Sequence, residues 1–236
     1  MADEKIISKT QDKPAQEAWL MSVARVIVKP IYFALFRPRV LGRDNFKNLP
    51  KNKPIIFIGN HIHQFDAAAL GVLTPRNPHF LAKIELSRNK WVGWALRSMG
   101  LVFVDRDERN QGVKEAIQQL SQGKTIAIFP EGTAKLEYKK PNELLPFKFG
   151  AAKMAMTTNA TIVPVAISGK YKFWARPKIS FGTPFKLDKK HTLEKNNERL
   201  RDEVLKLMKL SGVENPRKIA GKPARNPSKA PPVLDN

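Results

Sequence analysis

The chain has 236 residues, of which 42 are Lys or Arg and 21 are Asp or Glu, so its formal net charge is +21. Its hydrophobic content of 42% is enough for a sizeable core, and the absence of cysteine excludes a disulfide scaffold, a thiolate zinc site and a thiol nucleophile. The charge calls for an anionic partner, and nucleic acid, an anionic membrane, a phosphorylated substrate or an acidic carrier protein would each provide one.

A mostly apolar run, Trp19 to Phe36, is the first predicted helix. Arg25, Lys29 and Pro30 interrupt it, which argues against a simple membrane-spanning helix. The order of charges also differs from that of a cleavable signal peptide, because an acidic, polar leader precedes the run and basic residues follow it. The pattern favours a helix that lies in one leaflet with Arg25, Lys29, Arg37 and Arg39 against lipid phosphates. A helix buried against the rest of the domain is the alternative.

Four short runs rich in Ile and Val predict buried parallel strands in the middle of the chain. They are Pro54 to Gly59, Leu101 to Val104, Thr125 to Phe129 and Ile162 to Ile167. Helix-length segments alternate with them at Ala67 to Leu73, Glu85 to Met99, Asn110 to Ser121 and Phe149 to Thr158. This alternation predicts an α/β fold, in which a mostly parallel central sheet is flanked by helices.

The carboxyl-terminal part of the chain contains one more predicted helix, Thr192 to Leu210, whose apolar residues recur at helical spacing. From Gly212 onward the chain is basic and rich in proline, which predicts a flexible tail. The predicted organisation is a polar leader at 1–15, a membrane-interacting helical segment at 16–39, an α/β domain at 40–211 and the tail at 212–236.

Polar residues follow three of the predicted strands directly. The first strand is followed by Asn60 to Asp66, the second by Asp105 to Asp107 and the third by Pro130 to Thr133. Open α/β sheets bind their ligands at the carboxyl ends of the strands. We therefore expect these three segments to converge on one site.

His61 and Asp66 are the candidate catalytic pair within these segments. A histidine can remove a proton from an alcohol, and a carboxylate on its other ring nitrogen fixes the tautomer and stabilises the imidazolium. A substrate hydroxyl would then attack an acyl ester or thioester directly. A regular helix would place the two side chains about 140° apart, so we expect His61 on the loop and Asp66 at the helix start. The alternative is that Asp66 is only the N-cap of that helix.

Other motifs in the sequence do not meet their structural requirements. Gly123-Lys124-Thr125 resembles the end of a phosphate-binding loop, but it lacks the glycine five positions earlier and precedes a strand. The histidine spacing after the first strand resembles a zinc-binding loop, but only His79 and His191 could complete it, so no metal site is predicted. The signature of an RNA-binding sheet is also missing, so charge is the only argument for nucleic acid.

Four segments, in this order, resemble the characteristic blocks of the glycerolipid acyltransferases, and most closely those of the lysophosphatidic acid acyltransferases. They are Asn60-His61 with Asp66, Gly100 to Arg106, Phe129 to Thr133 and Val163 to Ile167. The resemblance covers roughly residues 40–185 and excludes the leader and the tail. Four motifs in order are far more specific than any one of them.

The resemblance implies an activity and its participants. His61 would be the general base on the free sn-2 hydroxyl of lysophosphatidic acid, Asp66 would orient it, and the product would be phosphatidic acid. The acyl donor would be acyl-coenzyme A or acyl-acyl carrier protein as a co-substrate, with no cofactor and no metal. A membrane anchor at Trp19 to Phe36 would hold the enzyme peripherally at the cytoplasmic face of the cell membrane, where phospholipid is its partner.

The resemblance also implies a set of substrate-binding residues. Arg106 would hold the acceptor phosphate, with Lys83 as a second cation. Glu131 would bind the glycerol or orient the cations, and Gly132 and Thr133 would bring backbone and hydroxyl donors to an oxyanion. An ion pair of Arg106 with a neighbouring acid, and a simple tight turn after the third strand, are the alternatives.

Two departures from the family pattern leave the acceptor open. Ala134-Lys135 stands where Arg-Ser often follows the Glu-Gly-Thr core, and His63 and Gln64 stand where many members have Ser and a bulky residue. We expect His63 to have a structural role. Another lysolipid as acceptor, and a non-enzymatic protein that binds lipid or nucleic acid, remain the alternative functions.

Overall fold

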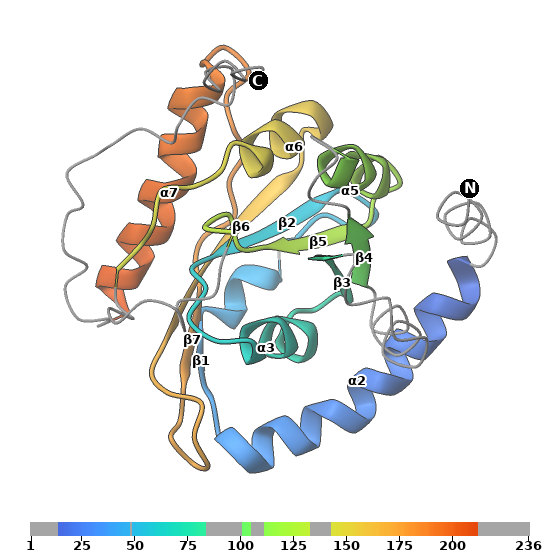
Figure 1. Ribbon diagram of the computed structural model, residues 1–236, viewed down its shortest axis with the longest axis vertical. Coiled ribbons are helices and arrows are strands. Elements are labelled where there is room, and N and C mark those ends of the chain that lie inside the picture. Colours follow the sequence, from blue (N-terminus) through green and yellow to red (C-terminus); the bar gives the residue numbers. More distant parts are fainter. Residues whose placement is uncertain (1–13, 48, 84–100, 105–110, 133–142, 212–236) are drawn as a thin grey trace, which may run out of the picture.

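The computed structural model describes residues 14–47, 49–83, 101–104, 111–132 and 143–211. The helices are α2 (Pro14–Phe36), η1 (Arg43–Phe46), α3 (Phe65–Leu73), α5 (Gln111–Ser121), α6 (Gly150–Thr158) and α7 (Leu193–Leu210). The strands are β1 (Arg39–Leu41), β2 (Ile55–Gly59), β3 (Pro78–Lys83), β4 (Leu101–Val104), β5 (Thr125–Ile128), β6 (Thr161–Ser168) and β7 (Lys178–Phe181). Figure 1 shows their arrangement.

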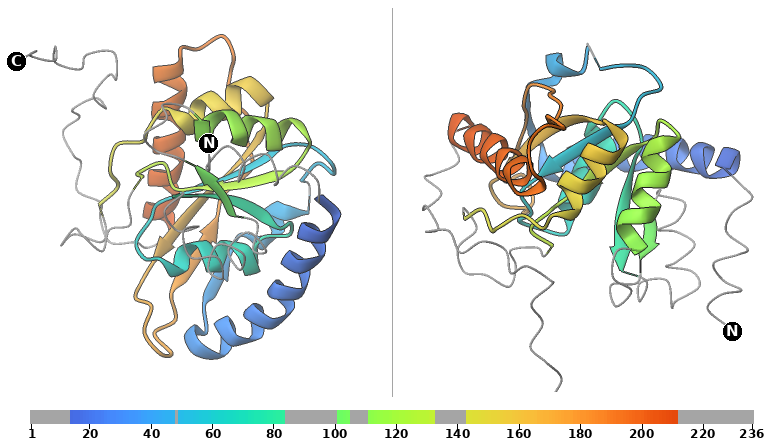
Figure 2. Two further views of the ribbon diagram at one scale, coloured as in Figure 1. Left: turned by 45° about the vertical axis from the view of Figure 1, so that its right-hand side comes forward. Right: turned by 90° about the horizontal axis from the view of Figure 1, so that it is seen from above.

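The strands form one sheet in the order β1-β7-β6-β2-β5-β3-β4. All neighbouring pairs are parallel except β6 and β7, which are antiparallel. The prediction of an α/β fold with a mostly parallel central sheet is therefore confirmed. Helices α2 and α3 cover one face of the sheet and α5, α6 and α7 cover the other (Figures 1 and 2).

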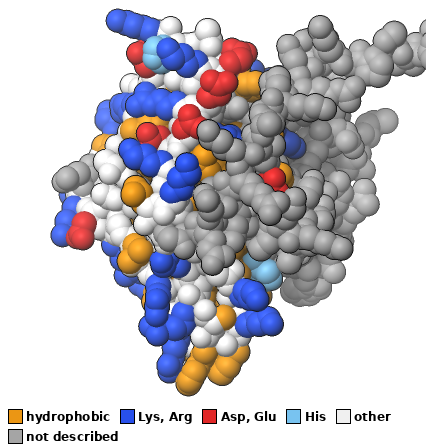
Figure 3. Space-filling model, turned by 90° about the vertical axis from the view of Figure 1, so that its left-hand side faces the viewer, with side chains coloured by type: hydrophobic (Ala, Val, Ile, Leu, Met, Phe, Trp, Pro, Cys, Tyr) orange, Lys and Arg blue, Asp and Glu red, His pale blue; other side chains and the backbone are white. Residues whose placement is uncertain are grey.

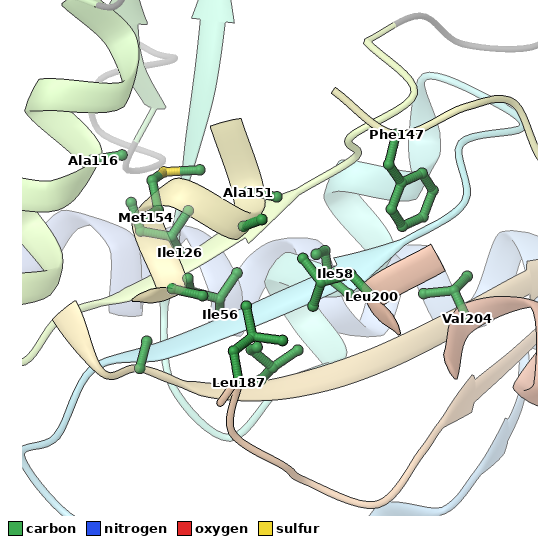
Figure 4. Close-up of a cluster of buried hydrophobic side chains, with 14 of the residues drawn as sticks. Ile56, Ile58, Ala116, Ile126, Phe147, Ala151, Met154, Leu187, Leu200 and Val204 are labelled. Carbon is green, nitrogen blue, oxygen red and sulfur yellow. The ribbon is translucent and has the colours of Figure 1, made fainter. Parts of the chain in front are cut away.

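The central strand β2 explains the continuous apolar run in the sequence. Ile56 and Ile58 pack into the core beneath α5, α6 and α7, whereas Ile55 and Phe57 pack into the core beneath α2 and α3. Because successive side chains of a strand point to opposite faces, a strand covered on both faces needs apolar residues at every position. Figure 4 shows the first of these cores, to which Leu200 of α7 also contributes.

The four strands expected from the sequence are all present, but β1, β3 and β7 were not expected. β1 is a three-residue edge strand with two exposed positions, so it has no apolar run. β3 begins with Pro78 and contains His79, which obscure its apolar content. The predicted helices at α3, α5, α6 and α7 are confirmed, with Thr192 as the N-cap of α7. The helix expected at Glu85 to Met99 lies outside the described residues.

Helix α2 has a buried side and an exposed apolar side. Tyr32 and Phe36 are almost fully buried against the core beneath α3. Arg25 donates to the backbone carbonyls of Val72 and Thr74, so it satisfies carbonyls at the carboxyl end of α3 instead of facing lipid, and our expectation for it was wrong. No helix in the described ranges is both long and apolar enough to cross a bilayer.

Candidate active site

The loop that follows β2 is fixed to the neighbouring strand by Asn60. This buried residue donates through Nδ2 to the carbonyl of Ile167 and accepts the Ile167 N–H through Oδ1, both at 2.8 Å. The side-chain amide thus replaces the backbone pairing that would continue the β2–β6 ladder past Gly59. As a result, the chain can turn away from the sheet at His61 without leaving buried backbone groups unpaired.

His61 and Asp66 form a hydrogen-bonded pair as the sequence predicts. His61 lies on the loop, Asp66 is the second residue of α3, and Nδ1 lies 2.8 Å from Oδ2. The same Oδ2 accepts the backbone N–H groups of Ile62 and His63 at 2.7 and 2.8 Å. An ionised carboxylate can only accept, so Nδ1 carries the ring proton and Nε2 keeps its lone pair. The N-cap of α3 is Gln64, so the alternative that Asp66 is the N-cap is wrong.

The imidazole of His61 is oriented by a second contact. Its ring stacks on Phe129, at the end of β5, with centroids 4.3 Å apart and planes 9° apart. Asp66 is fully buried, whereas the His61 side chain remains 18% exposed. The imidazole is therefore held on two sides, and part of its ring stays accessible.

Glu131 connects three segments of the chain around the pair. One carboxylate oxygen accepts the N–H of His61 and the other accepts the N–H of Leu145, both at 2.8 Å. The side chain is almost fully buried. Glu131 therefore joins the end of β5 to the loop between β2 and α3 and to the segment before α6, a role that the sequence motif alone did not reveal.

Gly132 forms a tight turn at the end of β5. Its φ of +74° is in the left-handed region, and its N–H donates to the carbonyl of Phe129 at 3.0 Å. A Cβ at this position would lie 2.6 Å from Cε of Lys148, so the Lys148 side chain crosses directly over the turn. The sequence analysis did not single out Lys148, and the structure places its side chain beside the turn that follows β5.

A family profile described as Acyltransferase matches residues 39–168, which include all of these residues. The match covers more than half of the chain. The chain belongs to the acyltransferase family. Because β2, the loop between β2 and α3, β5 and Glu131 all lie inside the matched range, the candidate site is part of the family's own domain.

Individual relatives agree with this membership. The chain is 34% identical to the 1-acyl-sn-glycerol-3-phosphate acyltransferase of Bacillus subtilis, over 53% of this chain and 61% of that protein. It is 33% identical to the protein of the same name from Saccharomyces cerevisiae, over 55% of this chain and 42% of that protein. The chain spans about half the length of the curated relatives that it matches.

This chain shares its fold with a protein whose structure has been solved. It is the crystal structure of the 1-acyl-sn-glycerophosphate (LPA) acyltransferase PlsC from Thermotoga maritima, which matches with a TM-score of 0.63. The match covers 86% of this chain and 85% of the other, at 22% sequence identity. The likeness shows that the two proteins share their overall architecture.

The structure does not describe the side chains of three predicted substrate-binding residues. Arg106 and Thr133 lie outside the described residues, and so does the side chain of Lys83. The backbone of Lys83 ends β3 and pairs with Val104, the last residue of β4. Because β4, β3, β5 and β2 are parallel neighbours, the carboxyl ends of β3 and β4 lie at the same edge of the sheet as the loop that follows β2.

His63 contributes to the packing of the loop between β2 and α3. Its Nδ1 accepts the N–H of Phe65 at 3.2 Å, and its ring lies against the rings of Phe65 and Tyr171. These contacts are what the expected structural role requires. In the part of the chain that the structure describes, no group of three or more His, Asp or Glu side chains is arranged to hold a metal ion.

Proposed function

We propose that this chain is an O-acyltransferase that moves a fatty acyl group from an acyl thioester to the free sn-2 hydroxyl of lysophosphatidic acid, which gives phosphatidic acid. The observation that carries this proposal is the His61–Asp66 pair, with a proton on Nδ1 and a partly open ring. The names of the relatives, which are 1-acyl-sn-glycerol-3-phosphate acyltransferases, support the choice of acceptor.

The proposed reaction needs no nucleophile from the protein. Nε2 of His61 removes the proton of the acceptor hydroxyl while its oxygen attacks the thioester carbonyl. Asp66 stabilises the imidazolium that forms. When the tetrahedral intermediate collapses, the C–S bond breaks and the imidazolium returns the proton to the leaving thiolate. The products are the acylated lipid and the free thiol of coenzyme A or acyl carrier protein, and the base is restored without any cofactor.

The acceptor phosphate would be held by the cations at the same edge of the sheet. In this proposal Arg106 and Lys83 bind the phosphate, and Lys148 adds a positive charge above Gly132. The N–H of Gly132 is already used in the turn, so Thr133 is the better candidate donor to an oxyanion. Glu131 would act by holding the His61 loop in place, since both of its oxygens accept backbone bonds.

We further propose that the enzyme lies at the cytoplasmic face of the membrane through an apolar rim made of two elements. The first is the outer stripe of α2, where Val26, Ile27 and Ile31 are 72%, 56% and 52% exposed. The second is the β6–β7 connection, whose Phe173 and Trp174 are 70% and 50% exposed. Single exposed apolar residues are ordinary, but a contiguous set of this size is typical of a membrane or protein contact.

The two elements of the apolar rim are joined by hydrogen bonds. Trp174 donates its backbone N–H to the carbonyl of Leu35 at 2.8 Å and its indole N–H to that of Ala34 at 3.0 Å. Arg37 lies over the Trp174 ring at 3.7 Å. The hydrogen bonds hold the tip of the connection beside the end of α2, as Figures 1 and 2 also show.

The charges around the apolar rim favour an anionic bilayer as the partner. Exposed cations flank both elements: Lys29, Arg37, Arg39, Lys170, Lys172 and Arg176. The sequence contains no acidic residue between Glu17 and Asp44 or between Glu143 and Asp188. In Figure 3 hydrophobic side chains gather at the lower tip of the molecule beside Lys and Arg side chains, at the end where Figure 1 places the β6–β7 connection. Each cation near an anionic membrane surface contributes about 1 kcal/mol.

The activity is tested by acyl transfer in mixed micelles that contain lysophosphatidic acid and either acyl-coenzyme A or acyl-acyl carrier protein. We expect product with the parent protein and a loss of at least about 100-fold in kcat with His61→Ala, because a general base contributes about 10²–10⁴-fold. His191→Ala, in the turn before α7, serves as the matched control. Equal turnover by the parent and His61→Ala would overturn the mechanism, and no turnover with either donor would overturn the assignment of the acceptor.

A further inference from the structure

Three buried polar atoms near the catalytic pair have no hydrogen-bond partner among the described residues. They are Oδ1 of Asp66, the hydroxyl of Tyr171 and the hydroxyl of Tyr32. Oδ2 of Asp66 accepts three hydrogen bonds, so the two oxygens of one carboxylate have very different surroundings. A buried polar group that stays unpaired costs about 1–3 kcal/mol, and a charged one costs more. Three such atoms in one place point to a polar network that the loop's own hydrogen bonds do not explain.

The three groups interact with one another electrostatically. Burial raises the pKa of Tyr171, and the negative charge of Asp66 and the neighbouring Tyr32 raise it further. Burial also raises the pKa of Tyr32; the neighbouring Tyr171 hydroxyl partly offsets this increase, and the charge of Asp66 adds a smaller one. Both phenols therefore stay protonated at neutral pH. Each of them has a proton to donate beside a carboxylate oxygen that lacks a donor.

The ring of Tyr171 is held in place by residues from two elements. It follows β6 in the β6–β7 connection and meets Phe36 of α2 edge-on, with centroids 5.4 Å apart. It also lies against His63 of the catalytic loop at 5.0 Å. Tyr32 also contacts Phe36, with the two ring centroids 5.2 Å apart. Packing therefore fixes the Tyr171 ring beside the loop that carries His63.

We propose that Tyr171 is a positioning residue for the His61–Asp66 pair, with its hydroxyl donating to Oδ1 of Asp66 and Tyr32 donating in turn to Tyr171. The inference rests on the proposed acyl transfer, because it assigns a role within that site. A donor on Oδ1 holds the carboxylate in the plane in which Oδ2 receives Nδ1 of the imidazole. It also withdraws part of the negative charge that stabilises the imidazolium.

A change from tyrosine to phenylalanine isolates this role. Among the described residues, the titratable groups around the pair include Glu131 and Lys148 near the end of β5, His63 in the loop, Tyr32 on α2 and Tyr171 itself. Tyr171 is neutral, so Tyr171→Phe alters none of these charges and keeps the aromatic ring. A change in the pH dependence of the variant would therefore report the lost hydroxyl.

The experiment measures kcat, the KM for lysophosphatidic acid and the pH–rate profile of Tyr171→Phe in mixed micelles. We expect kcat to fall about tenfold, as is usual when the group that orients a ligand or base is removed. The KM should stay unchanged. The acidic limb of kcat/KM should move to higher pH, because a carboxylate without its donor attracts the imidazolium more strongly. Tyr32→Phe should produce a smaller shift in the same direction.

Ser180→Ala is the matched control, because Ser180, in β7, also has a buried hydroxyl without a partner among the described residues. The proposal is overturned if Tyr171→Phe keeps the parent kcat and acidic limb, or if it changes only the KM. An NMR titration of the His61 imidazole without substrate provides a second readout, in which the ring should protonate at higher pH in Tyr171→Phe than in the parent. If the parent protein shows no turnover, the proposed function fails, while an unchanged titration overturns the role of Tyr171.

Discussion

At the scale of single residues, the site depends on side chains that replace backbone partners. Asn60 binds both polar backbone groups of Ile167, and Glu131 binds the N–H groups of His61 and Leu145. The pairing of His61 with Asp66 was predictable because the two residues are close in the sequence and their chemistry is complementary. The partners of Asn60 and Glu131 were not, because they lie 107 and 70 residues away and a backbone group has no sequence signature.

Asn60→Ala tests whether the catalytic loop depends on this replacement. The variant leaves a buried N–H and a buried carbonyl of Ile167 unpaired, so we expect a loss of about 2–4 kcal/mol in the free energy of unfolding. Urea denaturation measures this loss. Asn77→Ala, whose amide forms hydrogen bonds with the side chains of Arg25 and Ser22 on α2, should cost much less. Similar losses in both variants would show that Asn60 does not have the stabilising role described.

At the scale of secondary structure, the sequence identifies the elements covered on both faces and misses those at or near the edges. The continuous apolar run of β2 correctly predicted a strand covered on both faces, because every position of this strand is buried. β7 has no comparable run over its four residues, and β1 pairs with it at the edge. The exposed Phe173–Trp174 tip was also missed, since two aromatic residues in a loop do not form a periodic pattern.

The apolar rim predicts how vesicle binding responds to substitution. Replacing Phe173 and Trp174 together by Ser should weaken binding to vesicles of phosphatidylcholine and phosphatidylglycerol by at least about tenfold, since a buried aromatic side chain contributes about 1.5–3 kcal/mol. Co-sedimentation measures the binding. The control is Leu210→Ser, at the end of α7, where the leucine is 76% exposed. An equal loss in the control would mean that general hydrophobicity, not the apolar rim, determines binding.

At the scale of the whole molecule, two buried tyrosines link stability to alkaline pH. The pKa values of Tyr32 and Tyr171 are both raised above the ordinary value of 10.0. Above that value the unfolded chain loses tyrosine protons that the folded chain retains, so the unfolded state binds fewer protons and stability falls as pH rises. Below it, neither state ionises these groups and their effect on stability is constant.

Denaturant unfolding between about pH 8 and pH 11 checks this dependence. We expect the free energy of unfolding of the parent to decrease steeply above about pH 10. The double variant Tyr32→Phe and Tyr171→Phe should show a shallower decrease over the same range, because it lacks both groups. Parallel curves for the two proteins would contradict the raised pKa values, since lysine titration is common to both.

The position of the apolar rim at one end of the molecule has a kinetic consequence. A protein seated in this way would meet only the leaflet to which it is bound, and its acceptor and its product would both stay within that leaflet. Its search for the next acceptor would then be a two-dimensional search, in which the density of lysolipid at the surface replaces its bulk concentration. Diluting the acceptor with inert phospholipid at constant total acceptor should therefore slow turnover, although the amount of substrate in the tube has not changed.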